Sequence, residues 1–534
     1  MERRELLLGD EAVALGALHA GISGAYAYPG TPSTELFEFI EAQKDHHQVH
    51  ARWSPNEKVA YEEALGMSYA GKRAIVSMKH VGLNVAADPF MNSGVTGVNG
   101  GLVVCVADDP GMHSSQNEQD TREFAHFGLI PCLEPANQQE AYDMVSFGFE
   151  LSETLKIPVL LRLVTRLAHS RAGVVTGTQR SKNALNKTAR GGQFTLLPTN
   201  ARVLYRQLTD KEPKFLQRSE ESPYNRLALP AGHHKIGVIS SGIATNYFLE
   251  AARPDHGMPH LHIGHYPIPL DKMRALVNAV DEVWLVEEGY PFIEDQLRGV
   301  MGVHGKTIRG KRDGFLPRTG ELTPGIVAQA MGKPGDSPWK PTINPLPKRP
   351  PALCPGCPHT DTFKAMNEAT SIYEQPTVTS DIGCYTLGFY PPLNAIETCV
   401  DMGASISMAT GAVHAGLFPV LCAIGDSTFG HSGITSLLSA VEEDTNMVVF
   451  ILDNSTVAMT GTQESLSTGE RLHSIVRGLG IPTAHIRDIV PLAKNHAENV
   501  KVIREEIEHK GLSVIISTRP CIQIRKKNPA EAKS

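Results

Sequence analysis

The segment Gly425-Asp426-Ser427-Thr-Phe-Gly-His-Ser-Gly433 follows the apolar run from 420 to 424 and leads into an apolar-faced helical pattern. A glycine-rich turn after a buried strand lets backbone N–H groups approach a phosphate. The carboxylate of Asp426 in such a turn can hold a hard divalent cation. The alternative is an ordinary strand-to-helix turn in which Asp426 caps the helix.

A second apolar run, from 447 to 452, ends in the polar turn Asp453-Asn454-Ser455-Thr456. Two adjacent parallel strands that end together bring the Asp426 carboxylate, the Asn454 amide oxygen and a backbone carbonyl around one cation. Oxygen ligands of this kind suit Mg²⁺ that also bridges a diphosphate. Either turn alone is commonplace, but the pair predicts a metal and diphosphate site.

Similar apolar runs, rich in Val and Ile, alternate with segments of helical period along the whole chain. This pattern is typical of parallel strands covered by helices on both faces. We therefore predict an α/β fold with several doubly wound parallel-sheet domains. The predicted strands are 74–78, 102–107, 158–163, 235–240, 283–287, 420–424, 447–452 and 513–517.

The length of 534 residues suggests three or four domains. Two stretches interrupt the alternation, one polar and one containing Lys-Pro-Gly-Asp-Ser-Pro-Trp-Lys-Pro. Proline-rich composition favours extended chain. The predicted division is a domain at 1–190, a linker at 191–230, a domain at 231–335, a Pro-rich linker at 336–350 and a domain at 351–534.

Composition excludes several classes of protein. The formal net charge is −7, which argues against nucleic acid as the main partner. A hydrophobic fraction of 41% and a charged fraction of 20% are ordinary for a soluble globular protein and exclude extensive disorder. No apolar run is long enough for a signal peptide or a membrane span. We expect a cytoplasmic location and no membrane insertion.

Four of the eight cysteines have positions in the sequence that are typical of metal ligands or redox groups. Cys354 and Cys357 form a Cys-x-x-Cys motif, Cys384 ends the string Asp381-Ile-Gly-Cys384, and Cys521 lies much further along the chain. Such a set can hold structural Zn²⁺, serve as a redox dithiol, or bind a [4Fe–4S] cluster. Because Cys384 and Cys521 both follow expected strands, a shared site is favoured.

The paired turns resemble the Gly-Asp-Gly…Asn motif of thiamine diphosphate enzymes, with Ser427 in the place of the last Gly. Those enzymes need a carboxylic acid hydrogen-bonded to the aminopyrimidine ring. Glu57, at an expected helix start, is the candidate. The string Ser54-Pro-Asn-Glu57 is also typical of a capping box with Pro at the first helical position, and the two roles are compatible.

Longer strings resemble the 2-oxoacid:ferredoxin oxidoreductase superfamily, and within it the large (alpha) subunit of the indolepyruvate ferredoxin oxidoreductases. The resemblance covers nearly the whole chain. The strings that carry it are 28–35 (Tyr-Pro-Gly-Thr-Pro-Ser-Thr-Glu), 78–89, 106–119, 286–289 (Val-Glu-Glu-Gly), the Cys354 motif and 381–384 (Asp-Ile-Gly-Cys).

This resemblance implies a thiamine diphosphate-binding fold with the pyrimidine-binding domain at 1–190, a transketolase C-terminal-like domain at 231–335 and the diphosphate-binding domain at 351–534. It implies a role for each matching residue. Glu57 contacts the aminopyrimidine, Thr31 and Arg122 contact the substrate, and Cys354, Cys357, Cys384 and Cys521 bind one [4Fe–4S] cluster. The cofactor-binding set is Gly425, Asp426, Ser427, Asn454, Thr456, Gly383 and His359, of which Asp426, Asn454 and the Thr456 carbonyl hold Mg²⁺.

The implied reaction is oxidative decarboxylation of a 2-oxoacid, an arylpyruvate such as indolepyruvate, to an acyl-coenzyme A. Electrons pass through the cluster to ferredoxin or another electron-transfer protein. The implied assembly includes a small (beta) subunit, as a hetero-oligomer such as a dimer of heterodimers. Two alternatives stay open: a non-oxidative thiamine-dependent decarboxylase or ligase with zinc or nothing at the cysteines, and a non-catalytic electron-transfer subunit.

Three departures from the family pattern bear on these expectations. The ferredoxin-like C-terminal domain usual in relatives is absent from the sequence, so we expect electrons to leave the single cluster directly. Thr460-Gly-Thr-Gln463 stands where the family has Thr-Gly-His-Gln. Met459 stands where the pyruvate enzymes carry Asn beside the substrate, and a flexible apolar side chain there suits a larger apolar or aromatic substrate.

Overall fold

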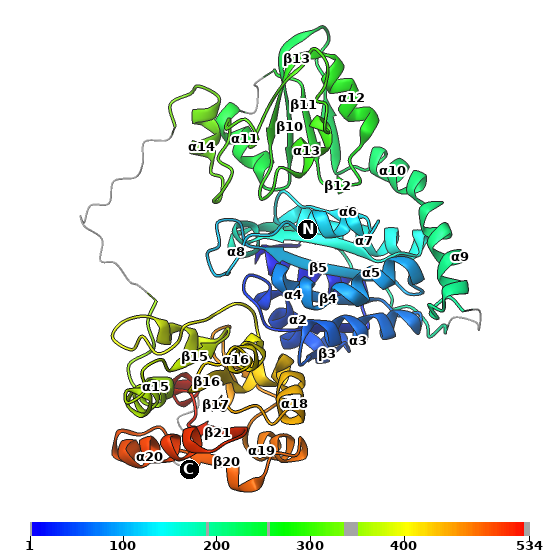
Figure 1. Cartoon of the computed structure of the whole chain (residues 1–534). Helices are drawn as coiled ribbons and strands as arrows, with labels where there is room; N and C mark the ends of the chain where they lie inside the picture. Colours follow the sequence, from blue (N-terminus) through cyan, green and yellow to red (C-terminus); the bar gives the residue numbers. More distant parts are fainter. Residues whose placement is uncertain (1–2, 188–191, 254–256, 336–350, 528–534) are drawn as a thin grey trace. The chain divides into compact units, whose positions relative to one another are not determined.

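The computed structural model describes residues 3–187, 192–253, 257–335 and 351–527. The chain divides into two compact units, which we call the N-terminal unit (Met1–Lys340) and the C-terminal unit (Pro341–Ser534). Both contain mainly parallel sheets flanked by helices, which confirms the predicted α/β fold (Figure 1). The predicted Pro-rich linker at 336–350 lies outside the described residues. No helix in the described ranges is long and apolar enough to cross a bilayer.

All eight predicted strands are present, with ends close to those predicted. Their even apolar composition is explained by burial: every residue of β5 (Leu102–Asp108), for example, is buried. A strand covered by helices on both faces needs apolar residues at successive positions rather than at alternate ones. The prediction of buried strands is therefore confirmed.

The N-terminal unit is built around a seven-stranded sheet with the order β12-β6-β7-β5-β4-β2-β3. All neighbours are parallel except β12 and β6. Beside it, β1 (Arg3–Leu8) and β8 (Arg171–Thr176) form an antiparallel pair. The other strands are β2 (Gly24–Ala27), β3 (His50–Trp53), β4 (Ala74–Lys79), β6 (Cys132–Leu133), β7 (Val159–Val164) and β12 (His265–Tyr266).

Two groups of helices pack against this sheet. One group contains α1 (Gly9–His19), α2 (Thr34–His47) and α7 (Gln138–Leu155), in which α1 contacts both of the others. The other contains α3 (Glu57–Tyr69), α4 (His80–Val85) and α5 (Ala87–Thr96). The short helices α6 (Thr121–Phe127) and α8 (Thr165–His169) follow β5 and β7. Because the strands are parallel, their carboxyl ends and the loops that follow lie along one edge of the sheet.

A second sheet of the N-terminal unit has the order β14-β13-β10-β11-β9. Its elements are β9 (Asn225–Ala228), β10 (His234–Ser241), β11 (His260–Ile263), β13 (Val280–Val286), β14 (Thr307–Arg309), α11 (Ala244–Ala252), α12 (Leu270–Asn278), α13 (Phe292–Arg298) and α14 (Pro324–Ala330). The connection after β11 places β12 on the first sheet, so that main-chain hydrogen bonds join the two regions. The domain boundaries at 190 and 231 stay predictions.

The segment interpreted as a linker, 191–230, contains regular structure in its described part. It carries α9 (Pro198–Thr209) and α10 (Glu212–Glu220), and β9 already belongs to the second sheet. Its few apolar residues anchor these helices, because Leu208 and Phe215 are buried within a mainly polar stretch. The low average hydrophobicity of the segment gave no indication of these two buried positions.

His265, in the strand that joins the two sheets, predicts an acid-sensitive stability. Its side chain is fully buried, neither ring nitrogen has a hydrogen-bond partner in the described chain, and burial lowers its pKa to about 3. In the unfolded chain a histidine takes up its proton near a pH of about 6.5. Unfolding therefore binds a proton below that pH, and this residue alone should reduce the unfolding free energy by about 2 kcal/mol between pH 8 and pH 5.

His265→Phe should remove that part of the pH dependence. Guanidinium unfolding followed by tryptophan fluorescence measures it, because Trp53 and Trp284, the tryptophans among the described residues, both lie in the N-terminal unit. His304→Phe places the same substitution at an exposed position and should leave the pH dependence as in the wild type. Equal pH dependence in wild type and His265→Phe would contradict the assignment.

The C-terminal unit contains one fully parallel sheet with the order β15-β16-β17-β21-β20. Successive residues of its strands enter different cores: Leu421 and Ala423 pack in one, Cys422 and Ile424 in the other. This alternation is the two-residue period of a strand. It confirms that the sheet is covered on both faces.

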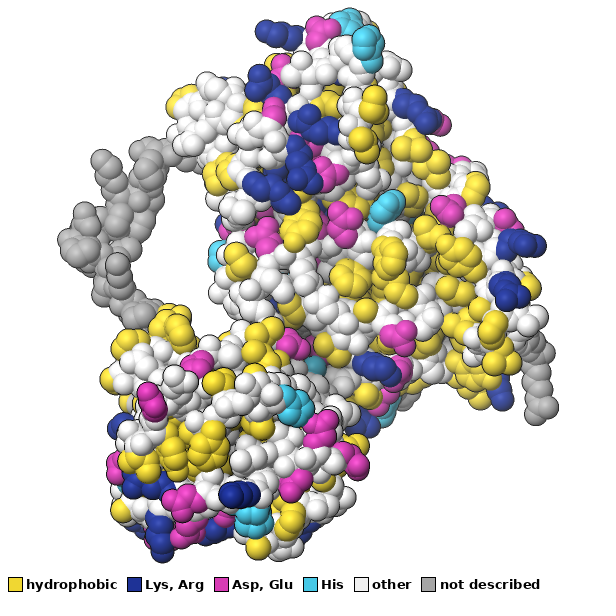
Figure 2. Space-filling model, viewed as in Figure 1, with side chains coloured by type: hydrophobic (Ala, Val, Ile, Leu, Met, Phe, Trp, Pro, Cys, Tyr) yellow, Lys and Arg dark blue, Asp and Glu magenta, His cyan; other side chains and the backbone are white. Residues whose placement is uncertain are grey.

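The strands of this sheet are β15 (Thr377–Ser380), β16 (Val420–Gly425), β17 (Val448–Asp453), β20 (Ile486–Ile489) and β21 (Ser513–Thr518). The helices that flank it are α15 (Pro358–Thr370), α16 (Ala404–His414), α18 (Ile434–Glu442), α19 (Gly469–Gly478) and α20 (His496–Glu508). On the face shown in Figure 2, positive and negative side chains lie interspersed, in keeping with the small net charge.

Candidate functional site

The two polar turns of the C-terminal unit follow neighbouring strands. β16 and β17 are parallel and paired, with Gly425 opposite Leu452, so both strands end at the same level of the sheet edge. Asp426 and Asn454 come directly after these ends. The predicted adjacency of the two turns is thus confirmed, while their role as Mg²⁺ ligands stays a prediction.

Asp426 has the properties of a cation ligand. Its side chain is 2% exposed, and its Oδ2 atom has no hydrogen-bond partner among the described residues. Burial, with a smaller effect from the charge of Asp453, raises the pKa of Asp426 to about 8. The short helix α17 (Asp426–Thr428) begins at this residue with Gly425 as its N-cap, so the alternative capping role is wrong. A buried carboxylate oxygen without a partner is costly unless a cation or proton satisfies it, and the site therefore fits Mg²⁺.

Asn454 is held between a turn and a histidine. Its Oδ1 accepts a hydrogen bond from the Thr456 amide at 3.1 Å, as the turn alternative predicts. Its amide nitrogen donates to His359 Nε2 at 3.3 Å. Burial lowers the pKa of His359 to about 4, so its ring is neutral near pH 7 and can accept. The adjacent Asp453 side chain accepts a hydrogen bond through its Oδ2 from the Gly469 amide at 2.9 Å.

Two glycines allow an aromatic ring to pack beside this edge. A side chain at Gly425 or Gly383 would place its Cβ 2.7 or 2.3 Å from the ring of Tyr385. The Tyr385 hydroxyl donates to Asp381, and burial raises the pKa of that carboxyl to about 6. Gly383, a predicted cofactor residue, thus has a clear packing role. Ser427 is half-buried in α17.

The four predicted cysteine ligands lie together in the C-terminal unit. Burial, and then the charges of Cys357, Cys521 and Cys354, raise the pKa of the Cys384 thiol to about 12. Cys357 and Cys521 are buried, Cys384 is half-buried and Cys354 is exposed. The sequence prediction of a shared group of thiols agrees with this arrangement. Burial also raises the pKa of the Cys357 thiol.

The cysteines and the metal-site turn are directly connected. The Cys521 amide donates to the Asn454 carbonyl oxygen at 3.0 Å. His359, which accepts from the Asn454 side chain, follows closely after Cys357 in the sequence. Two hydrogen bonds therefore join the group of thiols to the end of β17.

In the N-terminal unit, Glu57 is the first residue of α3 and is 5% exposed. The predicted capping box is wrong: Asn56 is the N-cap and accepts from the Val59 amide at 2.9 Å, while Ser54 donates to Glu63. Proline at 55 therefore precedes the helix. A Cβ at Gly82 would lie 2.5 Å from Glu57 Oε1, so the backbone of α4 passes directly against the carboxylate.

The predicted substrate residue Thr31 lies half-buried in the turn before α2. Its carbonyl oxygen accepts a 3.4 Å hydrogen bond from Ser114 Oγ, in the loop after β5. The same Ser114 offers its carbonyl oxygen to Lys79 Nζ at 2.7 Å. Burial lowers the pKa of Lys79 to about 8. Sequence reasoning missed this lysine, although it stands inside the family string 78–89.

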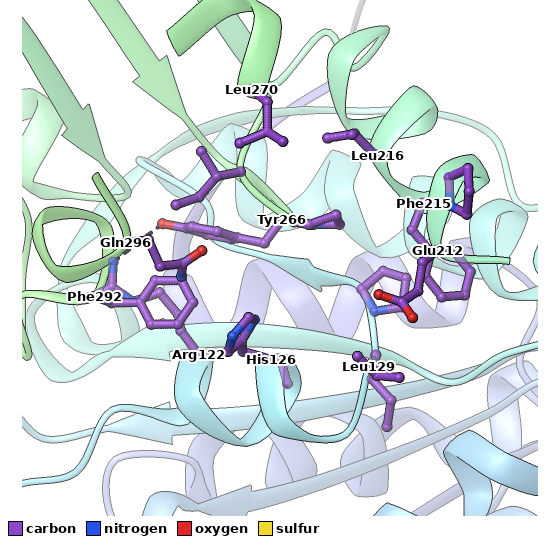
Figure 3. A pocket seen from close by; sticks show the side chains of 16 residues that line it. Arg122, His126, Leu129, Glu212, Phe215, Leu216, Tyr266, Leu270, Phe292 and Gln296 are labelled. Carbon is purple, nitrogen blue, oxygen red and sulfur yellow. Dashed lines mark hydrogen bonds between the residues drawn. The ribbon is translucent and has the colours of Figure 1, made fainter. Parts of the chain in front are cut away.

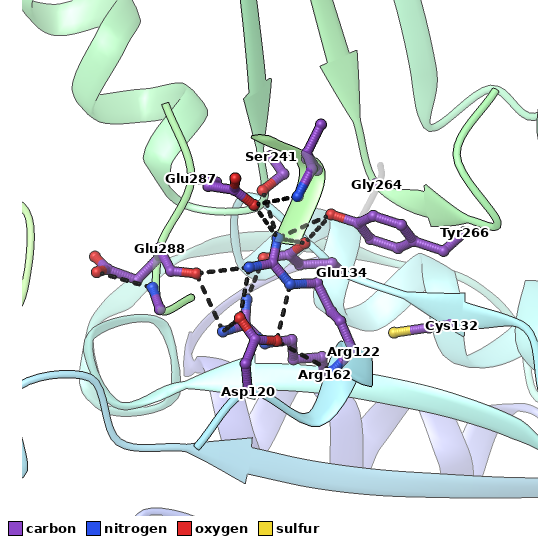
Figure 4. Close-up of polar contacts among 12 residues, drawn as sticks. Asp120, Arg122, Cys132, Glu134, Arg162, Ser241, Gly264, Tyr266, Glu287 and Glu288 are labelled. Carbon is purple, nitrogen blue, oxygen red and sulfur yellow. Dashed lines mark hydrogen bonds and ion pairs between the residues drawn. The ribbon is translucent and has the colours of Figure 1, made fainter. Parts of the chain in front are cut away.

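Arg122 is buried in an ion-pair network between the two sheets of the N-terminal unit (Figure 4). Its guanidinium contacts Asp120 and Glu287, the latter at 3.1 Å. Arg162 contacts Asp108 at 2.6 Å and Glu134 at 2.5 Å. All the guanidinium nitrogens of Arg122 bind protein groups, so its predicted contact with a substrate carboxylate stays a prediction that this geometry does not favour.

The network holds more carboxylates than arginines, which sets the pKa values of its members. The arginines hold the pKa of Asp120 well below its usual range. Burial dominates at Glu287 and raises its pKa to about 7. Removing one arginine leaves buried carboxylates without a partner, a change that typically costs about 3–5 kcal/mol.

Arg162→Met is accordingly expected to lower the unfolding free energy of the N-terminal unit by about 3–5 kcal/mol. Arg166→Met is the matched control, because the side chain of Arg166 is 41% exposed and pairs with Glu321. Exposed pairs contribute about 0–1 kcal/mol. Guanidinium unfolding followed by tryptophan fluorescence compares the two, and similar losses would contradict a special role for the buried network.

A cavity of about 420 Å³ lies beside the network (Figure 3). Apolar side chains such as Leu129, Phe215 and Phe292 line it, and of the predicted site residues only Arg122 borders it. The cavity is formed by α6, α10, α13 and the chain before α12.

Two family models match separate parts of the chain. Residues 15–222 match the family "Pyruvate flavodoxin/ferredoxin oxidoreductase, thiamine diP-bdg". Residues 381–517 match "Thiamine pyrophosphate enzyme, C-terminal TPP binding domain". The second match spans Asp426, Asn454 and the strands β16 and β17 that precede them.

Curated relatives match over nearly the full chain. Indolepyruvate oxidoreductase subunit IorA of Pyrococcus abyssi is 36% identical over 98% of this chain and 86% of its own length. The subunit of the same name from Methanothermobacter marburgensis is 37% identical over 97% of this chain and 87% of its own. A solved 2-oxoglutarate:ferredoxin oxidoreductase from Magnetococcus marinus shares the fold, with a TM-score of 0.51 and 16% identity over 62% of this chain and 65% of that one.

Proposed function

The chain belongs to the indolepyruvate oxidoreductase IorA family of thiamine-dependent 2-oxoacid:ferredoxin oxidoreductases, and from this premise we propose its reaction, ligands and partners. It is an oxidoreductase subunit. The proposed reaction is oxidative decarboxylation of an arylpyruvate such as indolepyruvate to an acyl-coenzyme A. The observation that supports it most is the hydrogen-bonded connection between the Asn454 turn and the four cysteines.

Bound thiamine diphosphate supplies a nucleophilic carbon for the keto group and accepts the electrons released with CO₂. In the proposed site, the Asp426 carboxylate, the Asn454 amide oxygen and the Thr456 carbonyl hold Mg²⁺, with Gly425 and Ser427 at the diphosphate. The unpartnered Oδ2 of Asp426 is the atom that this ion would satisfy. Glu57 holds a proton toward the aminopyrimidine ring and so prepares the cofactor for reaction.

The four cysteines are proposed to bind a [4Fe–4S] cluster that takes electrons one at a time. A single structural Zn²⁺ held by four thiolates is the alternative. Iron and sulfide analysis of the anaerobically purified protein separates the two.

The proposed substrate contact is Thr31, through its hydroxyl. The family motif also implies Arg122, but the guanidinium nitrogens of Arg122 are all engaged in the buried ion-pair network. Met459 is 52% exposed and gives an apolar surface for an aromatic substrate. Coenzyme A is proposed as the acyl acceptor, and the related 2-oxoglutarate enzyme was solved with coenzyme A and succinyl-CoA bound. The proposed partners are a small (beta) subunit, in a dimer of heterodimers, and ferredoxin or another acceptor.

Anaerobic co-purification with the small subunit tests the proposal. With thiamine diphosphate, Mg²⁺, coenzyme A and an arylpyruvate, the complex should reduce a viologen dye and form acyl-coenzyme A, and it should do so faster than with pyruvate. Release of CO₂ without dye reduction would instead indicate a non-oxidative enzyme. Failure of the complex to bind thiamine diphosphate in calorimetry would leave only a non-catalytic subunit.

Asp426→Asn is expected to weaken binding of the Mg²⁺–thiamine diphosphate complex at least about tenfold, because an amide is a poorer ligand for a hard cation than a carboxylate. Calorimetry measures the change. Asp488→Asn, at a 62% exposed side chain of the same unit, is the control and should bind as the wild type does. Unchanged affinity in Asp426→Asn would remove this residue from the proposed ligand set.

A further inference from the structure

Three potential metal ligands that the proposed function does not use meet in the N-terminal unit. One ligand atom from each of Asp10, Glu35 and His169 lies within 4.8 Å of the other two. They come from different elements: Asp10 from the start of α1, Glu35 from the start of α2 and His169 from the end of α8. His169 Nε2 is 3.4 Å from Glu35 Oε2.

Asp10 is the member that needs an explanation. Its side chain is fully buried, and neither carboxylate oxygen makes a hydrogen bond of ordinary geometry to a described residue. The Leu36 amide lies close enough to favour the charged form, but burial and the nearby Glu35 charge dominate and raise the pKa of Asp10 well above its usual value. A buried carboxyl group with unpartnered oxygens is costly and is normally paired with a cation.

The surrounding backbone fixes the positions of the ligands. A Cβ at Gly9 would lie 2.2 Å from the Leu167 carbonyl oxygen, so the start of α1 is pressed against α8. Immediately outside the site, Leu8 pairs with Arg171 in the β1–β8 ladder. Arg171 also forms an ion pair with Glu11 at 3.2 Å. Asp10 and His169 are therefore placed by main-chain contacts on both sides.

We propose that Asp10, Glu35 and His169 bind a divalent metal ion, either Zn²⁺ or Mn²⁺. Two carboxylates and one imidazole suit these ions. The side chains of Glu35 and His169 are 38% and 33% exposed, so water can complete the coordination and the ion can enter from solvent. The ion neutralises Asp10 and replaces the proton shared by the His169–Glu35 pair.

Such an ion has a structural consequence for the neighbouring turn. Glu35 follows the turn that carries Thr31, and that turn is closed by Ser33 Oγ donating to the Gly30 carbonyl at 2.8 Å. The ion would tie the start of α2 to α1 and α8 at the edge of the sheet. This role does not depend on the proposed substrate or on thiamine binding.

The proposal is tested by measuring Mn²⁺ binding to the full complex. The complex is first saturated with Mg²⁺ and thiamine diphosphate, and its cysteine site is loaded. Loss of the free-ion signal in electron paramagnetic resonance counts the bound Mn²⁺. Wild type should bind one equivalent more than Asp10→Asn. His169→Gln, at a partly exposed side chain, should also lose that equivalent and guards against misfolding of the buried variant.

The control is Asp488→Asn, which alters a 2.7 Å carboxylate–histidine pair with His473 that has no third ligand among the described residues. It should bind as much Mn²⁺ as the wild type. A Zn²⁺ titration followed by thermal unfolding should raise the melting temperature of the wild type more than that of Asp10→Asn. Equal Mn²⁺ stoichiometry in wild type, Asp10→Asn and His169→Gln would overturn the site.

Discussion

Replacing Glu57 by glutamine is expected to lower turnover by about 10²–10⁴-fold, the range typical of a lost general acid or base. Glutamine has nearly the same size, so it fits between the start of α3 and the backbone at Gly82, where no larger group has room. It cannot exchange a proton with the aminopyrimidine ring. The measurement is viologen reduction by the anaerobic complex at saturating thiamine diphosphate.

The matched control is Glu62→Gln, on the same helix, where the side chain is 46% exposed and pairs with Lys58. It should keep wild-type turnover. Thiamine diphosphate affinity should change much less than turnover in Glu57→Gln, because the residues proposed to hold Mg²⁺ and the diphosphate are unchanged. Wild-type turnover in Glu57→Gln, with cofactor bound, would exclude Glu57 as the acid.

The fold was predictable because its strands are buried on both faces. The runs 420–424 and 448–452 carry apolar residues at every position. Successive side chains such as Leu421 and Cys422 enter different cores, so every position must be apolar. The same argument located the polar turns after them, since parallel strands end at one edge. The prediction of a linker at 191–230 rested on the average composition of that segment. It missed two buried apolar residues, which suffice to anchor α9 and α10.

The adjacency of the Asp426 and Asn454 turns was predictable, because parallel strands end at one edge of a sheet. The local prediction at Glu57 was wrong, because the Asn56 side chain caps the helix and Ser54 donates to Glu63 within it. The contacts of Arg122 with distant segments were not visible in the sequence. Arg122 forms an ion pair with Glu287, which follows a strand of the second sheet. This buried network occupies the Arg122 guanidinium, whereas the family motif implies a contact with the substrate.

The same limit applies to the group of Asp10, Glu35 and His169. Each residue is ordinary in its own segment, and their sequence positions have no metal-binding spacing. Only the packing of α1, α2 and α8 brings the three ligand atoms together. A buried acid whose oxygens lack hydrogen bonds was the signal, and burial of that kind is a property of the folded chain.

Cys384→Ala is expected to abolish dye reduction while leaving thiamine diphosphate bound. Cys384 shares its electrostatic environment with Cys357, Cys521 and Cys354, and loss of one thiolate leaves a four-ligand cluster incomplete. Iron and sulfide content and the visible absorption band should fall with the activity. Thiamine affinity should persist, because Asp426 and the Asn454 side chain are unchanged.

Cys399→Ala is the control that the chain itself offers. Cys399 is exposed and contacts Thr386, in the segment just after Cys384. The groups that shift its pKa are Thr386 and Asp381, and none of the four proposed ligand thiols is among them. This variant should keep its iron, its absorption band and its activity. Full iron content in Cys384→Ala would remove that residue from the ligand set. One zinc and no iron in the anaerobically purified wild type would replace the cluster by a structural ion, and dye reduction would then have to proceed without these cysteines.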